Sequence, residues 1–282
     1  MKRHFLSLFI LGGVALLAGA SANAATWNLT TGSNTGTNGN TRTFTGSDGT
    51  NTTASAWANT SGSSGSADLY KIEDAYLAQF GGTSGLGVQN RDAGQTGNTE
   101  SSSNGEHAVD NLGRYDSVLF DFSASASKIA LSSVTIGWTG SDSDITVLRY
   151  LGSTTPTLHA GAGNTNQSYA QLISSGEWEL IGHYANAPQG SALNLNNATF
   201  KSSSYWLVGA YNPLVGSCNA ATNPVSCSGL SLGNDAVKIA ALAGCKFGTP
   251  GCGQGGGGSV PEPATLGLLG LGLLGMARAR RH

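Results

Sequence analysis

The sequence predicts an all-β protein: an antiparallel β-sandwich of the jelly-roll type, followed by a flexible linker and a short C-terminal hydrophobic helix. Short apolar segments with strand-like alternation recur along the chain, and polar, turn-forming stretches separate them. There is no long amphipathic helical pattern and no repeat of about 20–50 residues, which disfavours helical, propeller and solenoid folds. Gly is abundant, with 42 residues, while charged residues make up only 11%. This composition suits an extracellular β-protein better than a helical enzyme.

The first 24 residues have the pattern of a secretory signal peptide. A short basic start precedes an apolar stretch at 5–20, and Ala22 and Ala24 flank Asn23 as a small-residue cleavage site. We expect signal peptidase to cut after Ala24, so that the mature protein works outside the cytoplasm. An uncleaved N-terminal membrane anchor is the alternative.

Residues 25–252 contain the segments expected to form the sandwich, and they are numerous enough for one domain with a real core. The Asp48-Gly49 pair favours a hairpin between two early strands. Residues 69–80 fit either two short strands or one helix, and we favour strands. The other predicted strands are residues 26–30, 41–45, 52–57, 117–122, 134–138, 144–150, 178–184, 204–211 and 236–242.

The C-terminal part has three successive pieces with different physical properties. Residues 253–259 are a Gly-rich linker, and residues 260–282 contain a proline-flanked motif, an apolar run and a basic tail. Prolines keep the motif extended and out of a helix. The apolar run at 264–277 has 14 residues, fewer than the roughly 20 of a permanent membrane span. A basic tail stays on the cytoplasmic side, so we expect a short transmembrane helix that anchors the chain transiently.

This arrangement resembles the PEP-CTERM sorting signal, which exosortases recognise. Pro261, Glu262 and Pro263 match its motif, and residues 266–274 match its helix. The resemblance implies that an exosortase processes the chain and that the membrane contact is through this helix. The basic tail of the signal corresponds to Arg278, Arg280 and Arg281.

The body of the chain is also similar to exosortase-dependent surface protein families that carry such tails. The resemblance implies a surface protein of an exopolysaccharide-producing, biofilm- or floc-forming Gram-negative bacterium. It places the protein at the cell surface, on the outer membrane or in the extracellular matrix, with exopolysaccharide as a candidate partner. It implies no biochemical activity. The matching pieces, within residues 69–245, are residues 85–88, 107–111, 136–138, 142–145 and 207–211.

The charge balance disfavours nucleic acid as a partner. Once the signal peptide and the tail beyond the motif are removed, nine of the 14 Lys and Arg residues remain against 15 of the 16 acids. The mature domain is therefore mildly acidic, whereas nucleic-acid binding needs a basic patch. An acidic surface is compatible with divalent cations.

The four cysteines all lie late in the domain and predict two disulfides. An even number of cysteines in an exported chain favours oxidation, and three pairings are available. We favour the sequential pairing because it closes short loops that contain Gly, Pro and Asn. A zinc site is the alternative, but the C-x-x-C pairs typical of such sites are missing. The predicted pairs are Cys218 with Cys227 and Cys245 with Cys252.

An acidic cluster is the best local candidate for chemistry. Its members ahead of a predicted core strand are Glu106, Asp110, Asn111 and Asp116, and Asp142 and Asp144 occupy a later turn. Loops between strands can converge, and carboxylate oxygens are ligands that calcium prefers. We therefore hypothesise a calcium ion that pins two loops together. The alternative is that these side chains cap turns and bond to the backbone.

Other arrangements give weaker signals, and we expect a non-catalytic protein without a bound organic cofactor. Neither a G-x-S-x-G nucleophile motif nor an H-E-x-x-H zinc motif occurs. Glu177 and Glu179 could act as a glycosidase pair, but solvent-facing strand residues explain them better. Aromatic side chains could bind sugars if exposed, and Tyr184 and Tyr211 are the candidates, whereas Trp138 and Trp206 are expected in the core. These alternatives leave a carbohydrate-binding or carbohydrate-cleaving module as the rival function.

Overall fold

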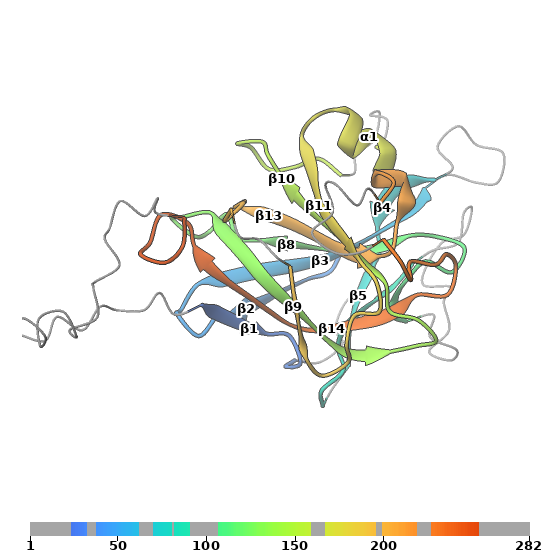
Figure 1. Ribbon diagram of the computed structural model, residues 1–282, viewed down its shortest axis with the longest axis horizontal. Coiled ribbons are helices and arrows are strands. Elements are labelled where there is room, and N and C mark those ends of the chain that lie inside the picture. The colour runs from blue at the N-terminus through green and yellow to red at the C-terminus, as the bar shows by residue number, and fades with distance from the viewer. Residues whose placement is uncertain are drawn as a thin grey trace, which may run out of the picture.

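Two antiparallel sheets of seven strands each pack face to face (Figure 1). The structure is a computed structural model, and it describes residues 24–32, 38–61, 70–80, 82–90, 107–158, 167–195, 199–218 and 227–253. The predicted β-sandwich is therefore confirmed. The signal peptide up to residue 23 and the predicted linker and sorting helix from residue 254 onwards lie outside the described residues.

The first sheet is built around its longest-paired strand, β14. The strand order is β12-β9-β14-β6-β5, and β1 and β7 also pair with β14. Its strands are β1 (Ala25–Asn28), β5 (Tyr76–Phe80), β6 (Gly85–Gln89), β7 (Val109–Asp110), β9 (Ile129–Thr139), β12 (Ala192–Asn194) and β14 (Ala236–Lys246).

The second sheet has the order β11-β10-β13-β8-β3-β2, and β4 pairs with β3. The described part of segment 69–80 forms two strands rather than a helix, one in each sheet, as the sequence favours. The strands of the second sheet are β2 (Thr41–Thr45), β3 (Asn51–Ser61), β4 (Lys71–Asp74), β8 (Asp116–Asp121), β10 (Ile145–Tyr150), β11 (Trp178–Tyr184) and β13 (Tyr205–Ala210).

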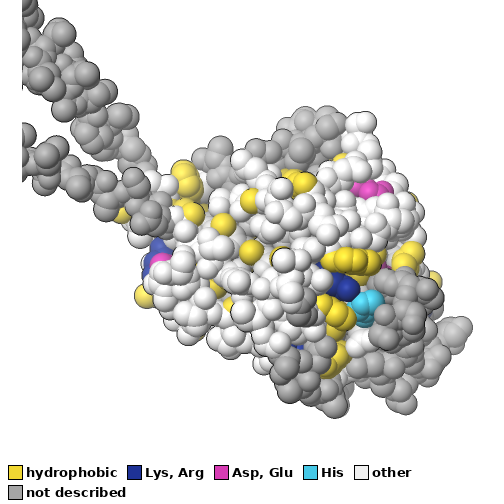
Figure 2. Space-filling view, turned by 90° about the horizontal axis from the view of Figure 1, so that it is seen from below, with side chains coloured by type: hydrophobic (Ala, Val, Ile, Leu, Met, Phe, Trp, Pro, Cys, Tyr) yellow, Lys and Arg dark blue, Asp and Glu magenta, His cyan; other side chains and the backbone are white. Residues whose placement is uncertain are grey.

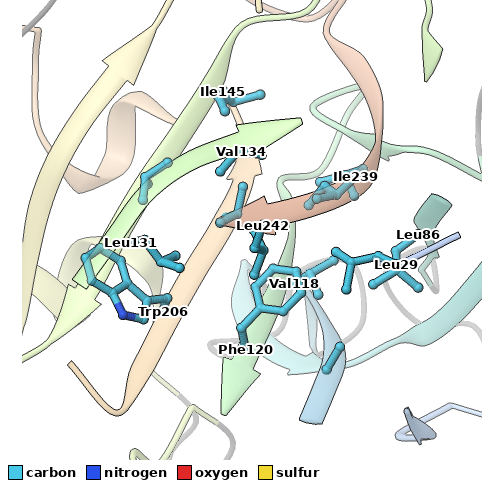
Figure 3. Packing of buried hydrophobic residues seen from close by; sticks show 14 of the residues in the cluster. Leu29, Leu86, Val118, Phe120, Leu131, Val134, Ile145, Trp206, Ile239 and Leu242 are labelled. Atoms are coloured by element: carbon cyan, nitrogen blue, oxygen red, sulfur yellow. The ribbon is translucent and has the colours of Figure 1, made fainter. Parts of the chain in front are cut away.

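The main core lies between the sheets. Alternate residues of β8 and β13 point inward, and Val118, Phe120 and Trp206 meet Leu131 and Leu242 of the first sheet (Figure 3). The indole nitrogen of Trp206 donates a hydrogen bond to the Ile129 carbonyl at 3.1 Å. Burial of aromatic and aliphatic side chains on this scale supplies the dominant favourable term in folding.

A second apolar cluster covers the outer face of the second sheet. The intervening residues of the same strands, among them Leu119 and Leu207, contact helix α1 (Tyr169–Ser174) and the 3₁₀ turn η1 (Pro213–Val215). The central strands β8 and β13 are buried on both faces, which explains their nearly continuous apolar sequences. Helix α1 begins with a capping box between Ser168 and Gln171, which satisfies two free backbone donors.

The first and the last described residues of the sandwich both lie near the C-terminal end of β14. Ala25 of β1 pairs with Gly244, and a disulfide joins Cys245 to Cys252 just beyond the strand. A second disulfide joins Cys218 to Cys227, so both bonds follow the sequential pairing. Within the described ranges, no helix combines the length and apolar character that a membrane crossing requires.

Candidate functional site

The carboxylates of three aspartates lie close together at the N-terminal end of β14, opposite the end that carries the Cys245–Cys252 disulfide. Asp142, Asp144 and Asp235 each offer one oxygen, and these oxygens lie within 4.8 Å of one another. Asp142 and Asp235 form an isolated parallel bridge, Asp144 directly precedes β10, and Asp235 directly precedes β14. Loops that are far apart in the sequence therefore meet at this point.

Backbone amides from several loops hold the two buried carboxylates. The Asp144 carboxylate accepts hydrogen bonds from the amides of Asn186 at 2.7 Å and Ser231 at 2.8 Å. The Asp235 carboxylate accepts one from the Asp144 amide at 2.8 Å and one from the Asn111 side chain at 2.6 Å. These bonds fix the relative positions of the loops and orient the oxygens.

The third carboxylate, that of Asp142, is half-buried. It accepts hydrogen bonds from the Ser143 amide at 2.8 Å and from the Ser231 hydroxyl at 2.6 Å. The Asn234 side-chain oxygen lies 2.9 Å from the same hydroxyl. The cluster therefore combines carboxylate, hydroxyl and amide oxygens within one small volume.

The electrostatics of the cluster favour an added positive charge or a proton. Burial, together with the charges of Asp144 and Asp142, raises the pKa of Asp235 to about 7, although two hydrogen bonds act in the opposite direction. Burial and the Asp142 charge also raise the pKa of Asp144. None of the ion pairs between described residues involves these three side chains. Like charges without a cation disfavour the ionised forms.

The chemistry of the donors fits a hard cation such as calcium. Calcium takes about six to eight oxygen ligands, mostly carboxylates, carbonyls and water. Asp142, Asp144 and Asp235 would supply the carboxylates, with Asn234 and Ser231 next to them. The same oxygens already accept backbone hydrogen bonds, so the turn-capping role that the sequence offered as the alternative is also present.

The structure brings together only part of the predicted ligand set. Asp142 and Asp144 lie in the cluster, but Asp110 and Asp116 are not members of it. Asp110 accepts a hydrogen bond from the Leu112 amide, and Asp116, on β8, accepts one from the Asn90 side chain at 2.9 Å. Glu106 lies outside the described residues.

Asp235 is the member of the cluster that sequence reasoning missed. It lies more than 90 residues after Asp144 in the chain, and only the pairing of β14 with its neighbours brings the two together. One signal could have found it: like Asp144, it directly precedes a strongly apolar strand.

The other candidate residues have structural roles. Glu179 forms ion pairs with Arg149 at 2.5 Å and Lys201 at 2.6 Å. Burial alone would raise the pKa of Glu179, but these two partners outweigh it and lower the pKa. Glu177 is exposed. A carboxylate that is held ionised by two cations is a poor general acid, so Glu179 does not suit that role.

Two predictions about aromatic residues need correction. Tyr184 is fully buried rather than exposed, because its hydroxyl donates a hydrogen bond to the Leu195 carbonyl inside the sandwich. Trp138 is half-buried instead of lying in the core, since it points away from the sandwich interior while Ile136 points into it. Trp206 is buried as expected.

Comparison with known families identifies the C-terminal part of the chain. A family model described as the PEP-CTERM protein-sorting motif matches residues 259–281. The chain therefore carries a PEP-CTERM sorting motif, which supports exosortase-dependent export to the cell surface. No curated protein and no solved structure matches the chain.

Proposed function

We propose that the protein is a non-catalytic component of the cell surface or extracellular matrix of an exopolysaccharide-producing Gram-negative bacterium. The sorting motif at residues 259–281 is the observation that carries this proposal. In the proposed sequence of events, signal peptidase removes residues 1–24. The segment at 264–277 then holds the chain briefly in the inner membrane, until an exosortase acts on the motif.

The arrangement of the sandwich supports a protein that is displayed from a tether. Ala25 and Cys252 mark the end of the domain next to the signal peptide and the sorting motif, since both lie near Gly244 and Cys245 of β14. The acidic cluster lies at the other end of β14, and an 11-residue strand spans about 30 Å. During anchoring, this end faces away from the membrane.

Calcium is proposed to stabilise the loops around the acidic cluster, at the N-terminal end of β14, and not to act as a catalytic ion. The cluster joins loops that precede β10 and β14 and follow β7 and β11. A bound ion would neutralise the mutual repulsion of the three carboxylates and hold these loops together.

The experiment that tests the proposed sorting compares the native host with a strain that lacks the exosortase. Intact mass and location of the protein are measured in both strains. We expect loss of the basic tail and surface or matrix location only when the exosortase is present. If Arg281 and His282 remain on the mature protein in both strains, the tail is an ordinary anchor and the proposal is wrong.

A further inference from the structure

A buried lysine stands on the outer face of the first sheet, between two aromatic rings. The Lys238 ammonium lies 3.9 Å from the Phe80 ring centroid and 4.4 Å from that of Trp138. Only 5% of the lysine surface is exposed. Cation–π contacts of this kind contribute about 0.5–2 kcal/mol, more when the site is desolvated.

A histidine completes the surroundings of this lysine. The Lys238 ammonium lies 2.9 Å from His107 Nε2, and the His107 ring contacts the Phe80 ring in a tilted arrangement with centroids 4.5 Å apart. When Nε2 accepts this hydrogen bond, the proton of the neutral ring is on Nδ1, which is buried and has no hydrogen-bond partner. The histidine therefore does not neutralise the lysine.

Two glycines make this arrangement possible. A Cβ on Gly137 would clash with the carbonyl oxygens of Thr83 and Ser84, and a Cβ on Gly87 would clash with that of His107. Without these side chains, the turn between β5 and β6 crosses over β9, and the backbone at His107 approaches β6. Phe80 and His107 are thereby placed beside Lys238.

The positive charge has no acidic partner within the described part of the chain. None of the ion pairs between described residues involves Lys238, and among those residues its ammonium has a polar contact only with His107. A buried charge is costly unless it is paired. Burial lowers the pKa of Lys238. The pKa of His107 is also lowered, mainly by burial and in addition by the positive charge of Lys238. An anion in contact with the Lys238 ammonium would supply a countercharge for it.

The lysine lines a cleft of about 550 Å³. Trp138 and Leu112 give the cleft apolar surface, and Ser141 and Asn234 give it neutral hydrogen-bonding groups. Figure 2 shows a face of the molecule on which a basic side chain and a histidine lie together with hydrophobic side chains. A sugar ring has the same combination of apolar C–H faces and polar edges.

We propose that this cleft binds a carboxylate-bearing sugar unit, a uronic acid, of an extracellular polysaccharide. The inference rests on the proposed matrix function and names the class of polymer. Lys238 supplies the charge for the carboxylate, and the apolar and neutral polar walls contact the ring. Nucleic acid is a poorer candidate because the domain as a whole is acidic.

The test compares two polymers with the same sugar backbone: polygalacturonate, with charged carboxylates, and its fully methyl-esterified form, with uncharged esters. Binding is measured by calorimetry with the intact secreted domain. EDTA is present, so that no divalent cation bridges the polymer to the acidic cluster. We expect binding of polygalacturonate that weakens with added salt, and at least about tenfold weaker binding of the ester. Equal binding of the two polymers overturns the proposal, and this comparison needs no variant.

Variants then locate the binding site. Lys238→Met keeps an unbranched side chain between the rings but removes the charge, and we expect it to weaken polygalacturonate binding by about tenfold or more. Lys246→Met, at the other end of the same strand, is the matched control and should bind like the wild type. If the Lys238→Met variant shows a cooperative melting transition, and is therefore folded, but binds polygalacturonate like the wild type, the assignment to this cleft is wrong.

Small competitors separate a sugar site from a simple anion site. D-galacturonate should displace the polymer, whereas acetate at the same concentration should not. Equal displacement by acetate would mean that the cleft takes any carboxylate and that the sugar assignment is wrong. The Lys238→Met variant should still lose its C-terminal basic tail when the exosortase is present. A failure of sugar binding is therefore distinguishable from a failure of the proposed surface sorting.

Discussion

The ammonium nitrogen of Lys238 lies 4.4 Å from the centroid of the Trp138 ring, and the two residues face each other across the β14–β9 pair. A charged residue in an apolar strand is thus stabilised by a cross-strand aromatic partner instead of a carboxylate. We expect a double-mutant cycle with Lys238→Met and Trp138→Leu to give a coupling energy of about 0.5–2 kcal/mol in the free energy of unfolding.

The control for this cycle is the ion pair between Lys246 and Asp48. It lies at 3.0 Å but is partly exposed, so its coupling in urea unfolding should stay below about 1 kcal/mol. A coupling between Lys238 and Trp138 that is indistinguishable from zero would show that the aromatic contact does not stabilise the lysine.

Replacing Gly137 should destabilise the domain by disturbing the outer face of the first sheet. The added methyl group of Gly137→Ala would meet backbone oxygens of Thr83 and Ser84, which cannot rotate away as a side chain can. We expect a loss of about 1–3 kcal/mol in unfolding free energy, measured by chemical denaturation. Ser132→Ala, at an exposed position of the same strand, should change it by less than about 0.5 kcal/mol. Equal stability of the two variants would contradict the close approach.

The stability of the cation-free protein should depend on pH through Asp235. The pKa of this carboxyl is about 7 in the folded protein, well above the value of about 3.9 in an unfolded chain. Its contribution to stability is therefore fully present below about pH 4 and is lost as the pH rises through about 7. At about 1.4 kcal/mol per pKa unit, a difference of about three units makes this loss on the order of 4 kcal/mol.

Asp235→Asn isolates this effect. Burial lowers the pKa of His183, which acts in the opposite direction at acid pH, but this residue is common to both proteins. In EDTA, we expect the unfolding free energy of the wild type to fall relative to that of the variant between pH 4 and 8. Parallel curves for the two proteins would rule out the raised pKa.

Calcium should stabilise the chelator-treated protein if the acidic cluster binds it. At a concentration about 100-fold above the dissociation constant, binding adds about 2.7 kcal/mol to the unfolding free energy, measured as a higher melting temperature. Asp142→Asn should abolish this increase. Asp121→Asn changes a half-buried aspartate outside the cluster and should preserve it. An unchanged melting temperature of the wild type on adding calcium would count against the site.

The strands that were predictable from the sequence are those with long apolar or alternating patterns. β2 and β11 have the predicted bounds, and most others differ by a few residues at their ends. Short strands such as β7 and β12 have too few residues to show a period. Helix α1 has six residues and buries only Tyr169 and Leu172, so its pattern is too brief to detect.

The candidate sites were predictable only where their residues are close in the chain. Asp142 and Asp144 are neighbours and share a turn, whereas Asp235 joins them through the register of β14. The same strand places Lys238 beside Trp138, and an isolated lysine in an apolar run gives no sign of its partner. Long-range pairing decides both sites, and local patterns carry no information about it.

The pairing of the first strand with the last also has a consequence for the timing of folding during export. β1 forms its ladder with the C-terminal half of β14 (Figure 1), so Trp27 pairs with Leu242 across more than 200 residues of chain. Contacts of such high sequence separation form slowly, because a long loop must close before they contribute. In the export route that we propose, the first sheet therefore cannot close until almost the entire chain has been translocated. The sorting segment directly follows in the sequence, so that proposal places completion of the fold and capture of the tail at the same stage of transport.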